Sequence, residues 1–387
     1  MSAVIVDVVR TPSGRGKPGG GLSSVHPATL LAGVLAELID RTGIDPALVD
    51  DVIGGCVTQS GEQSSNITRT AVLAADFPES VPATTVDRQC GSSQQAVHFA
   101  AQGVLAGAYD VAIACGVESM SRAPMFSNAQ GKDALRGPLA VRYPAGLIGQ
   151  GIAAEILAAR WKLDRTTLDE FAARSHRLAA ATAAAGGFDA ELSSAGVLDT
   201  DETIRPGTTV ESLANLRPAF TDPAALERFP EISWSVTPGN SSPLTDGASA
   251  ALIMSERVAA KLGLTPRARF HSFAVAGDDP TLMLTAVVPA TRKALERVSL
   301  TVDDIDTFEV NEAFAPVPLV WQHELGADPA RVNPRGGAIA LGHPLGGSGT
   351  RLLATMVNHL EQTGGRYGLQ TMCEAGGMAN ATIIERL

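Results

Sequence analysis

The chain has 387 residues, of which 45% are hydrophobic and 18% charged, a balance typical of a globular protein. Its formal net charge of −11 and the lack of a basic stripe exclude the usual kind of nucleic-acid binder. It has no apolar run of the ~20 residues that a membrane helix needs, and residues 1–7 resemble a strand rather than an export signal. We therefore expect a cytoplasmic protein of roughly two or three domain-sized units.

The cysteines lie far apart in the sequence and form no Cys-x-x-Cys pair: Cys56, Cys90, Cys115 and Cys373. Without an export signal, neither disulfides nor a zinc site are expected. The histidines also lack the spacing of metal ligands, so no metal site is predicted. Thiol reactivity is therefore the first function to consider for these side chains.

An internal duplication begins with residues 26–57, which match residues 279–310 without a gap. Both copies predict an amphipathic helix with a proline near its first turn, a short acidic loop and a strand. The two prolines are Pro27 and Pro280. Because the match keeps one offset over its whole length, we interpret it as a true repeat rather than a chance similarity.

The repeat resumes at Cys115 and Cys373, each of which follows an apolar strand and a preceding small-residue helix. A closing strand is expected at 248–255 in the first copy and at 381–386 in the second. The predicted fold is α/β, with two duplicated halves whose mixed sheets are covered by helices. The expected units are an N-terminal half (1–120 and 246–265), an inserted loop domain (121–245) and a C-terminal half (266–387).

The first candidate catalytic residue is Cys90, which follows a strand and opens a small-residue helix with Gly91 and Ser92. The free N–H groups and the dipole at a helix N-terminus favour a thiolate. Small neighbours also let a substrate approach closely. The alternative is a buried structural cysteine, which is the common role of a free cysteine.

Three further segments carry candidate groups. His343 stands in a glycine-rich turn before a helix, where it could activate a thiol or donate to an oxyanion; the alternative is a loop histidine bonded to the backbone. Asn311 follows the repeated strand and could hold a water or an oxyanion, or cap the next helix. Cys373 ends a strand, and its alternative role is structural.

Taken together, these four segments resemble the thiolase family. They occur in the family's order and spacing: Cys-Gly-Ser-Ser at Cys90, Asn-Glu-Ala-Phe-Ala at 311–315, Gly-His-Pro at 342–344 and Cys-x-x-Gly-Gly at 373–377. The resemblance runs nearly from end to end of the chain. It implies the five-layered thiolase fold, in which two related α/β halves carry a loop domain inserted into the first.

The resemblance also implies a role for each residue. Cys90 is then the nucleophile that accepts the acyl group, and His343 takes its proton. Asn311 holds a water in the oxyanion hole that His343 shares, and Cys373 is the acid/base at the α-carbon of acetyl-CoA. The backbone N–H groups of Cys90 and Ala375 form a second oxyanion hole.

Coenzyme A is implied as a substrate, and no tightly bound cofactor is expected. Positions matching the family's CoA contacts are Arg205, Phe220 and Ser242 in the inserted domain; the alternative for each is an ordinary loop residue. The family also implies a homodimer or homotetramer, with no nucleic-acid or membrane partner. The expected reaction is thiolytic cleavage of a 3-ketoacyl-CoA in fatty-acid or steroid side-chain β-oxidation.

Two departures from the family pattern qualify this interpretation. Short-chain biosynthetic members carry His-Met where this chain has Gly149-Gln150, which favours a bulkier acyl group. Ala375 replaces a glycine, so a positive φ there would be strained. The alternative functions are a biosynthetic acetoacetyl-CoA thiolase, a non-catalytic acyl or lipid carrier, and a decarboxylating condensing enzyme.

Overall fold

The computed structural model describes residues 2–193 and 197–387, so Met1 of the expected first strand and residues 194–196 of the expected inserted domain lie outside it. The strands are β1 (Ala3–Arg10), β2 (Gly14–Arg15), β3 (Asp51–Gly55), β4 (Ala83–Val86), β5 (Val111–Ser119), β6 (Thr245–Ser255), β7 (Ala268–Gly277), β8 (Thr307–Val310), β9 (Tyr367–Glu374) and β10 (Met378–Arg386). The helices are α1 (Pro27–Thr42), α2 (Ile67–Ala74), α3 (Ser92–Leu105), α4 (Arg136–Leu139), α5 (Gln150–Arg160), α6 (Arg165–Ala184), α7 (Val210–Ala214), α8 (Pro223–Arg228), α9 (Glu256–Lys261), α10 (Val287–Glu296), α11 (Pro316–Leu325), α12 (Ala338–Leu341) and α13 (Ser348–Thr363).

The described strands form one mixed sheet in the order β4-β3-β5-β6-β1-β7-β10-β9-β8, with β2 beside β6. The series β3-β5-β6-β1 is mirrored by β8-β9-β10-β7. In each series the first two strands are parallel and the remaining neighbours antiparallel. This symmetry confirms the duplication that the sequence predicts.

The two halves of the sheet meet at β1 and β7. Only two residue pairs join them, Val4 with Arg269 and Ile5 with Ala268. The sequence predicted a sheet in each half but not this junction, because nothing in the pattern of either strand marks its partner. The right-handed twist of the strands carries the two halves apart beyond these pairs.

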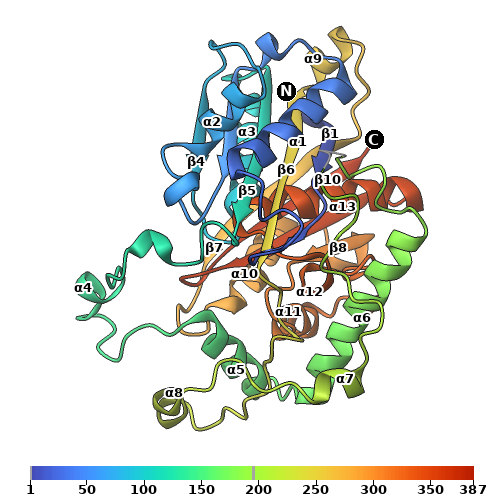
Figure 1. Ribbon diagram of the computed structural model, residues 1–387. Helices are drawn as coiled ribbons and strands as arrows, with labels where there is room; N and C mark the ends of the chain where they lie inside the picture. The colour runs from blue at the N-terminus through green and yellow to red at the C-terminus, as the bar shows by residue number, and fades with distance from the viewer. Residues whose placement is uncertain (1, 194–196) are drawn as a thin grey trace.

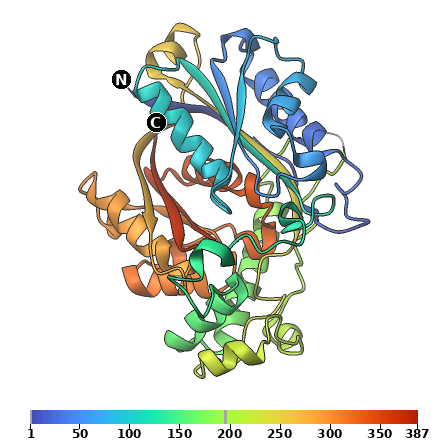
Figure 2. The same ribbon diagram turned by 90° about the vertical axis from the view of Figure 1, so that its left-hand side faces the viewer.

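Helices fill both outer faces and the space between the two half-sheets (Figures 1 and 2). Helices α1 and α2 cover the first half, and α10 covers the second. Between them, α3 and α13 contact each other and the strands of both halves. The buried face of α3 carries small residues such as Ala96, Ala100 and Ala101, which allow this close approach. The result is the five-layered α/β arrangement.

One predicted helix begins later than expected. The match to Pro27, which opens α1, placed a helix start near Pro280, but α10 begins at Val287 after a 3₁₀ turn at Leu284–Ala286. Met283 has φ of 49°, which is incompatible with a right-handed helix and stops α10 from extending toward Pro280. The helix prediction was therefore right in existence and wrong at its N-terminus.

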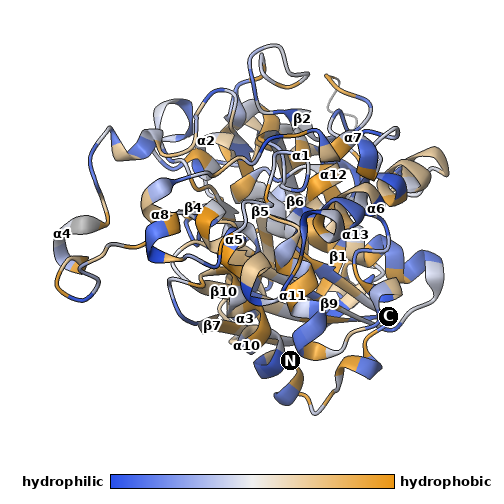
Figure 3. Cartoon of the chain, turned by 90° about the horizontal axis from the view of Figure 1, so that it is seen from below, coloured by the Kyte–Doolittle hydropathy of each residue, from blue (hydrophilic) through white to orange (hydrophobic). Residues whose placement is uncertain are grey.

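The segment between β5 and β6 contains helices α4 to α8 and long loops. Within it, α5 contacts α11 and α6 contacts α12, so the segment lies against the C-terminal half. The part around α4 projects away from the body of the molecule (Figures 1 and 3). In the part of the chain that the structure describes, no helix is both long and apolar enough to cross a bilayer.

Candidate functional site

Cys90 is held at the start of α3 by a tight turn that follows β4. The carboxylate of Asp87 accepts the N–H of Gln89 at 2.7 Å, and the Ser92 hydroxyl accepts the N–H of Arg88 at 2.9 Å. Gln89 has φ of 50°, an uncommon value for a residue other than glycine. The turn thus fixes the backbone on both sides of Cys90 before any substrate is present.

The Cys90 sulfur is buried, and the amide nitrogen of Gln150 lies 4.0 Å from it. Burial raises the pKa of Cys90 to about 12, and the neighbouring carboxyl of Glu374 raises it further, while Gln150 lowers it. The expectation that the helix N-terminus favours a thiolate is therefore wrong for the resting protein, because desolvation raises the pKa of Cys90. The resting group is a thiol, and it needs a base.

A histidine in the right protonation state lies in the other half of the molecule. The Ser348 hydroxyl donates to the carbonyl of Pro344 at 2.8 Å, so it accepts the N–H of His343 Nδ1 at 2.5 Å. His343 Nε2 is then left as an acceptor, and the side-chain amide of Asn311 donates to it at 3.3 Å. Burial and Arg351 lower the pKa of His343 to about 3, so the ring is neutral.

Asn311 follows β8, where its backbone N–H donates to the carbonyl of Thr371 on β9. Its side chain is buried, and its Oδ1 has no partner among the described residues. The structure thus brings Asn311 and His343 into direct contact, as their proposed shared oxyanion site requires. The free Oδ1 is an acceptor that a water could occupy.

Cys373 lies near the end of β9 and is also buried. Its pKa is raised by burial first and by the charge of Cys90 second, so ionisation of Cys90 disfavours ionisation of Cys373. The hairpin that follows takes its positive φ values at Gly376 and Gly377, of 88° and 79°, and not at Ala375. The expected strain at Ala375 therefore does not arise.

The N–H groups of Cys90 and Ala375 are the predicted second oxyanion hole. Within the described residues, neither donates a hydrogen bond to another residue. Ala375 is partly exposed in the hairpin between β9 and β10. Two unused backbone donors are thus available near the thiols, as an oxyanion site needs.

Glu118 on β5 supports the histidine turn from the opposite half. Its buried carboxylate accepts the N–H groups of Val57, Thr58 and Gly346 at 2.9–3.0 Å and the side-chain amide of Gln63 at 2.8 Å. Gly346 belongs to the 3₁₀ turn, Leu345–Gly347, that directly precedes α13. One carboxylate therefore ties the two halves together beside the site.

The three predicted CoA-contact residues do not gather in one cluster. Phe220 packs edge-on to Phe314 with ring centroids 5.7 Å apart, and the Ser242 hydroxyl donates to the carbonyl of Ala313 at 3.2 Å. Both therefore adjoin the segment that begins at Asn311. Arg205 is exposed, and no hydrogen bond or ion pair in the described part of the chain joins it to the other two.

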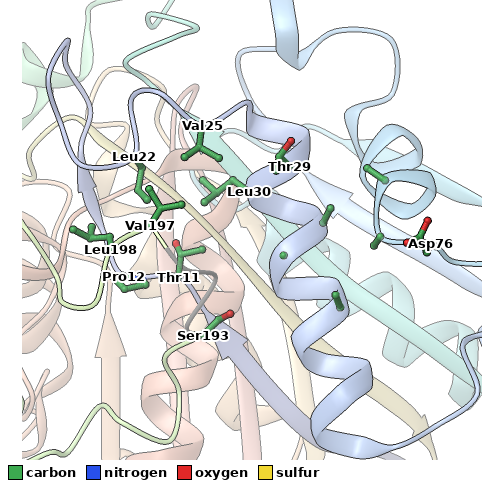
Figure 4. A pocket seen from close by; sticks show the side chains of 15 residues that line it. Thr11, Pro12, Leu22, Val25, Thr29, Leu30, Asp76, Ser193, Val197 and Leu198 are labelled. Carbon is green, nitrogen blue, oxygen red and sulfur yellow. The ribbon is translucent and has the colours of Figure 1, made fainter.

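The cavity shown in Figure 4 lies elsewhere. It measures about 320 Å³ and is lined mainly by apolar residues of α1 and by Thr11, Pro12, Val197 and Leu198. None of the candidate catalytic residues lines it. We therefore do not assign this cavity to the site.

Sequence reasoning missed three residues that shape this site. Glu118 is signalled by a carboxylate within an otherwise apolar strand, and Ser348 by a hydroxyl that follows His343 by about one helical turn. Gln150 was noted only as a departure from the family and not as a neighbour of the Cys90 sulfur. Its contact joins residues far apart in sequence, so no local pattern reveals it.

Comparisons with known proteins identify the family of this chain. The family description "Thiolase, N-terminal domain" matches residues 3–257, and "Thiolase, C-terminal domain" matches residues 264–386. A steroid 3-ketoacyl-CoA thiolase of Mycobacterium tuberculosis is 46% identical, covering 100% of this chain and 94% of the relative. A 3-ketoacyl-CoA thiolase of Serratia proteamaculans is also 46% identical, with 100% of both chains covered.

A solved structure gives the same answer for the fold. The crystal structure of the Bacillus anthracis acetyl-CoA acetyltransferase matches with a TM-score of 0.88 and 36% sequence identity, covering 100% of this chain and 99% of that chain. The family descriptions, the full-length relatives and the duplicated fold all agree. The chain therefore belongs to the thiolase family.

Proposed function

We propose that this protein is a 3-ketoacyl-CoA thiolase, which cleaves a 3-ketoacyl-CoA with free CoA to give acetyl-CoA and a shortened acyl-CoA. Two observations support the proposal: the charge of Cys90 acts on the pKa of Cys373, and Asn311 is hydrogen-bonded to His343. Relatives along the whole chain carry 3-ketoacyl-CoA thiolase as their name.

In the first half-reaction, neutral His343 accepts the proton of the Cys90 thiol as the sulfur attacks the 3-keto carbon. The Cα–Cβ bond breaks, and its electron pair passes to the α-carbon of the departing acetyl-CoA enolate. Cys373 gives that carbon a proton, which leaves an acyl group on Cys90. This covalent step divides a difficult bond cleavage into two easier transfers.

In the second half-reaction, the thiolate left on Cys373 takes the proton of free CoA, whose sulfur attacks the acyl-Cys90 thioester. The bond between the acyl group and Cys90 then breaks, and the proton held on His343 returns to the Cys90 sulfur. The N–H groups of Cys90 and Ala375 are proposed to stabilise the tetrahedral oxyanion. Asn311, through a water on its free Oδ1, and His343 would stabilise the enolate oxygen. A well-aimed donor of this kind contributes about 3 kcal/mol to a transition state.

Substrate recognition is proposed to use the inserted domain. Phe220 and Ser242 would contact the pantetheine part of CoA, since both adjoin the segment that begins at Asn311. Exposed Arg205 would meet the nucleotide part. CoA is a substrate here, and no tightly bound cofactor is proposed. The names of the relatives support β-oxidation of fatty-acid or steroid side chains and disfavour the biosynthetic alternative.

Assembly and location follow from the family as further proposals. We propose a cytoplasmic homodimer or homotetramer, which light scattering distinguishes from a monomer. We also propose that residues 121–245 act as a loop domain inserted into the first half and supply CoA and oligomer contacts. Limited proteolysis with and without CoA tests that division, because bound CoA should protect this segment.

Thiolysis tests the proposed reaction directly. The purified protein is mixed with CoA and a series of 3-ketoacyl-CoA substrates, from acetoacetyl-CoA to long-chain and steroid forms, and the loss of the enolate absorbance is followed. Cleavage by the wild type, with a loss of about 10⁴-fold or more in Cys90→Ala, is expected. Activity that survives Cys90→Ala, or no cleavage of any substrate, would overturn the proposal.

A further inference from the structure

A carboxyl group without partners is buried behind the nucleophile. Glu374 is the last residue of β9, and its side chain has no exposed surface. Neither of its oxygens accepts or donates a hydrogen bond among the described residues. An ionised carboxylate in such a place is costly, because it has lost its water and gained nothing in return.

This carboxyl group lies directly against the backbone that follows Cys90. A Cβ atom added to Gly91 would lie 1.9 Å from Glu374 Oε1, far inside contact distance. The glycine therefore makes room for the carboxyl group. Glu374 also raises the pKa of both Cys90 and Cys373, so its charge acts on both thiols.

A second unpartnered group faces the same position. The side-chain amide of Asn380 on β10 donates to Gln95 Oε1 at 3.2 Å, and its Oδ1 has no partner among the described residues. That oxygen lies 3.1 Å from the same added Cβ position at Gly91. An amide oxygen can only accept, and so can a carboxylate, so the ionised pair has no hydrogen to share.

A proton on the Glu374 carboxyl group would remove the buried charge and would supply the hydrogen that Asn380 Oδ1 lacks. We propose that Glu374 is a protonated carboxylic acid in the resting enzyme, that its O–H donates to Asn380 Oδ1, and that it is a positioning residue for Cys90. The neutral acid keeps a negative charge away from the sulfur while the thiolate forms. If Glu374 ionises, the two negative charges oppose each other and the thiolate becomes less accessible.

The charged groups around Glu374 are consistent with this state. Burial raises its pKa well above the usual range, Asp87 raises it further, and the cation of Arg88 lowers it. Within the described residues Arg88 forms no salt bridge with the carboxyl group, and its Nε is unpartnered. The two thiols, Cys90 just before α3 and Cys373 on β9, are the other titratable groups on which the charge of Glu374 acts. Desolvation is the largest effect, and it favours the neutral form.

The inference rests on the proposed role of Cys90, but alkylation tests it without needing thiolysis. The rate at which iodoacetamide modifies Cys90 is measured from acid to alkaline pH in the wild type and in Glu374→Gln. The variant Cys90→Ser is treated in the same way, so that labelling of the other cysteines can be subtracted at each pH. The amide in Glu374→Gln keeps a donor for Asn380 and carries no charge.

The expected ratio of the Glu374→Gln rate to the wild-type rate is one at acid and neutral pH and rises to about tenfold at alkaline pH, where the wild-type acid ionises. A ratio above one at every pH means a permanently ionised Glu374 and overturns the proposal. A ratio of one at every pH means no coupling and also overturns it. Glu309→Gln, which removes another buried carboxyl group with a raised pKa, is the control and keeps the ratio at one.

Two further readouts separate this role from a merely structural one. The infrared difference between wild type and Glu374→Gln at neutral pH should contain a protonated carboxylic-acid band, and its absence would overturn the proposal. Glu374→Leu, which cannot donate to Asn380, should lower kcat about tenfold while Glu374→Gln retains it. If alkylation and infrared results hold while no substrate is cleaved, the proposed function fails and this inference stands.

Discussion

The two copies of the repeat place a cysteine at matching positions and use it differently. Cys115 lies in the middle of β5, inside an apolar core cluster, and burial alone raises its pKa. Cys373 lies one residue before the end of β9, and its pKa also responds to Cys90. The two environments differ because β5 continues to Ser119 beyond its cysteine, whereas β9 ends at Glu374, directly after its cysteine.

The extra residues of β5 have a function of their own. They pair with the start of β6 and carry Glu118, whose carboxylate holds the histidine turn of the other half. In the second half the chain instead turns at Ala375 and returns as β10. In the proposed mechanism, one copy thus supplies the nucleophile and a scaffold, and the other supplies the acid/base groups. The two copies thus share a strand order although their side chains have different proposed roles.

The strongest test of this comparison substitutes the two cysteines. Cys373→Ala should lower kcat for thiolysis by about 10²- to 10⁴-fold, because it removes a proton donor, and should lower stability about as much as Cys115→Ala, because both side chains are buried. Cys115→Ala should leave kcat unchanged and lower the free energy of unfolding by about 1–2 kcal/mol, because it removes buried apolar contact. Steady-state kinetics and thermal denaturation measure both effects; equal kinetic losses in the two variants would contradict the contrast.

The scaffold role of the first half is tested by Glu118→Gln. Its side chain would offer one acceptor oxygen and one donor NH₂ to four donors, so at least one buried N–H loses its partner. We expect the free energy of unfolding to fall by about 1–3 kcal/mol and kcat to fall with it. Urea denaturation measures the first quantity. Unchanged stability and kcat would mean that the carboxylate is dispensable.

The dependence of stability on acid pH tests two buried histidines, one on α3 and one in the turn before α13. Burial lowers the pKa of both His98 and His343 to about 3, against about 6.5 in the unfolded chain. The unfolded state therefore binds the extra proton between these values, so stability is lost as pH falls through this window. Each of His98→Gln and His343→Gln should remove about 1.4 kcal/mol per pH unit from that slope.

Activity separates the two histidine variants. Only His343→Gln should lower kcat, by about 10²-fold or more, because only His343 is proposed to move a proton. Denaturant melts from about pH 6.5 down to about pH 4.5 give the slopes, and thiolysis at neutral pH gives kcat. If both variants kept the wild-type slope of unfolding free energy against pH, neither histidine would be buried in the neutral form.

The smallest expected effect concerns the orientation of His343. Ser348→Ala removes the acceptor for Nδ1–H and frees the ring to change tautomer. We expect a loss of about tenfold in kcat with KM nearly unchanged, since the substitution costs roughly one hydrogen bond. Ser249→Ala, which alters a buried serine bonded to the carbonyl of Gly347, is the matched control and should affect stability more than kcat.

The sequence predicted the parts of this protein that follow from local pattern. Hydrophobic periodicity located the repeats, and strand and helix ends located Cys90, Asn311, His343 and Cys373. It could not predict how β5 and β9 differ in length, where Met283 delays α10, or that β1 would join β7. These depend on contacts between residues far apart in sequence.

The protonation state of Cys90 was also predicted wrongly from the sequence. A helix N-terminus favours a thiolate, but the burial of Cys90 acts in the opposite direction, and Glu374 adds to this effect whenever its carboxyl group is ionised. Both effects need the folded chain, because Glu374 belongs to the other copy of the repeat. Local chemistry therefore indicated Cys90 as the candidate nucleophile but not its resting protonation state.

The narrow junction between β1 and β7 has a consequence for how the molecule could be divided. Since only two residue pairs link the half-sheets, the halves are held together mainly through α13, which packs on β1, β5 and β6 of the opposite copy. A fragment ending after β6 and α9 would leave that inner surface bare to water. Such a fragment should aggregate, and the intact chain should melt in one calorimetric transition.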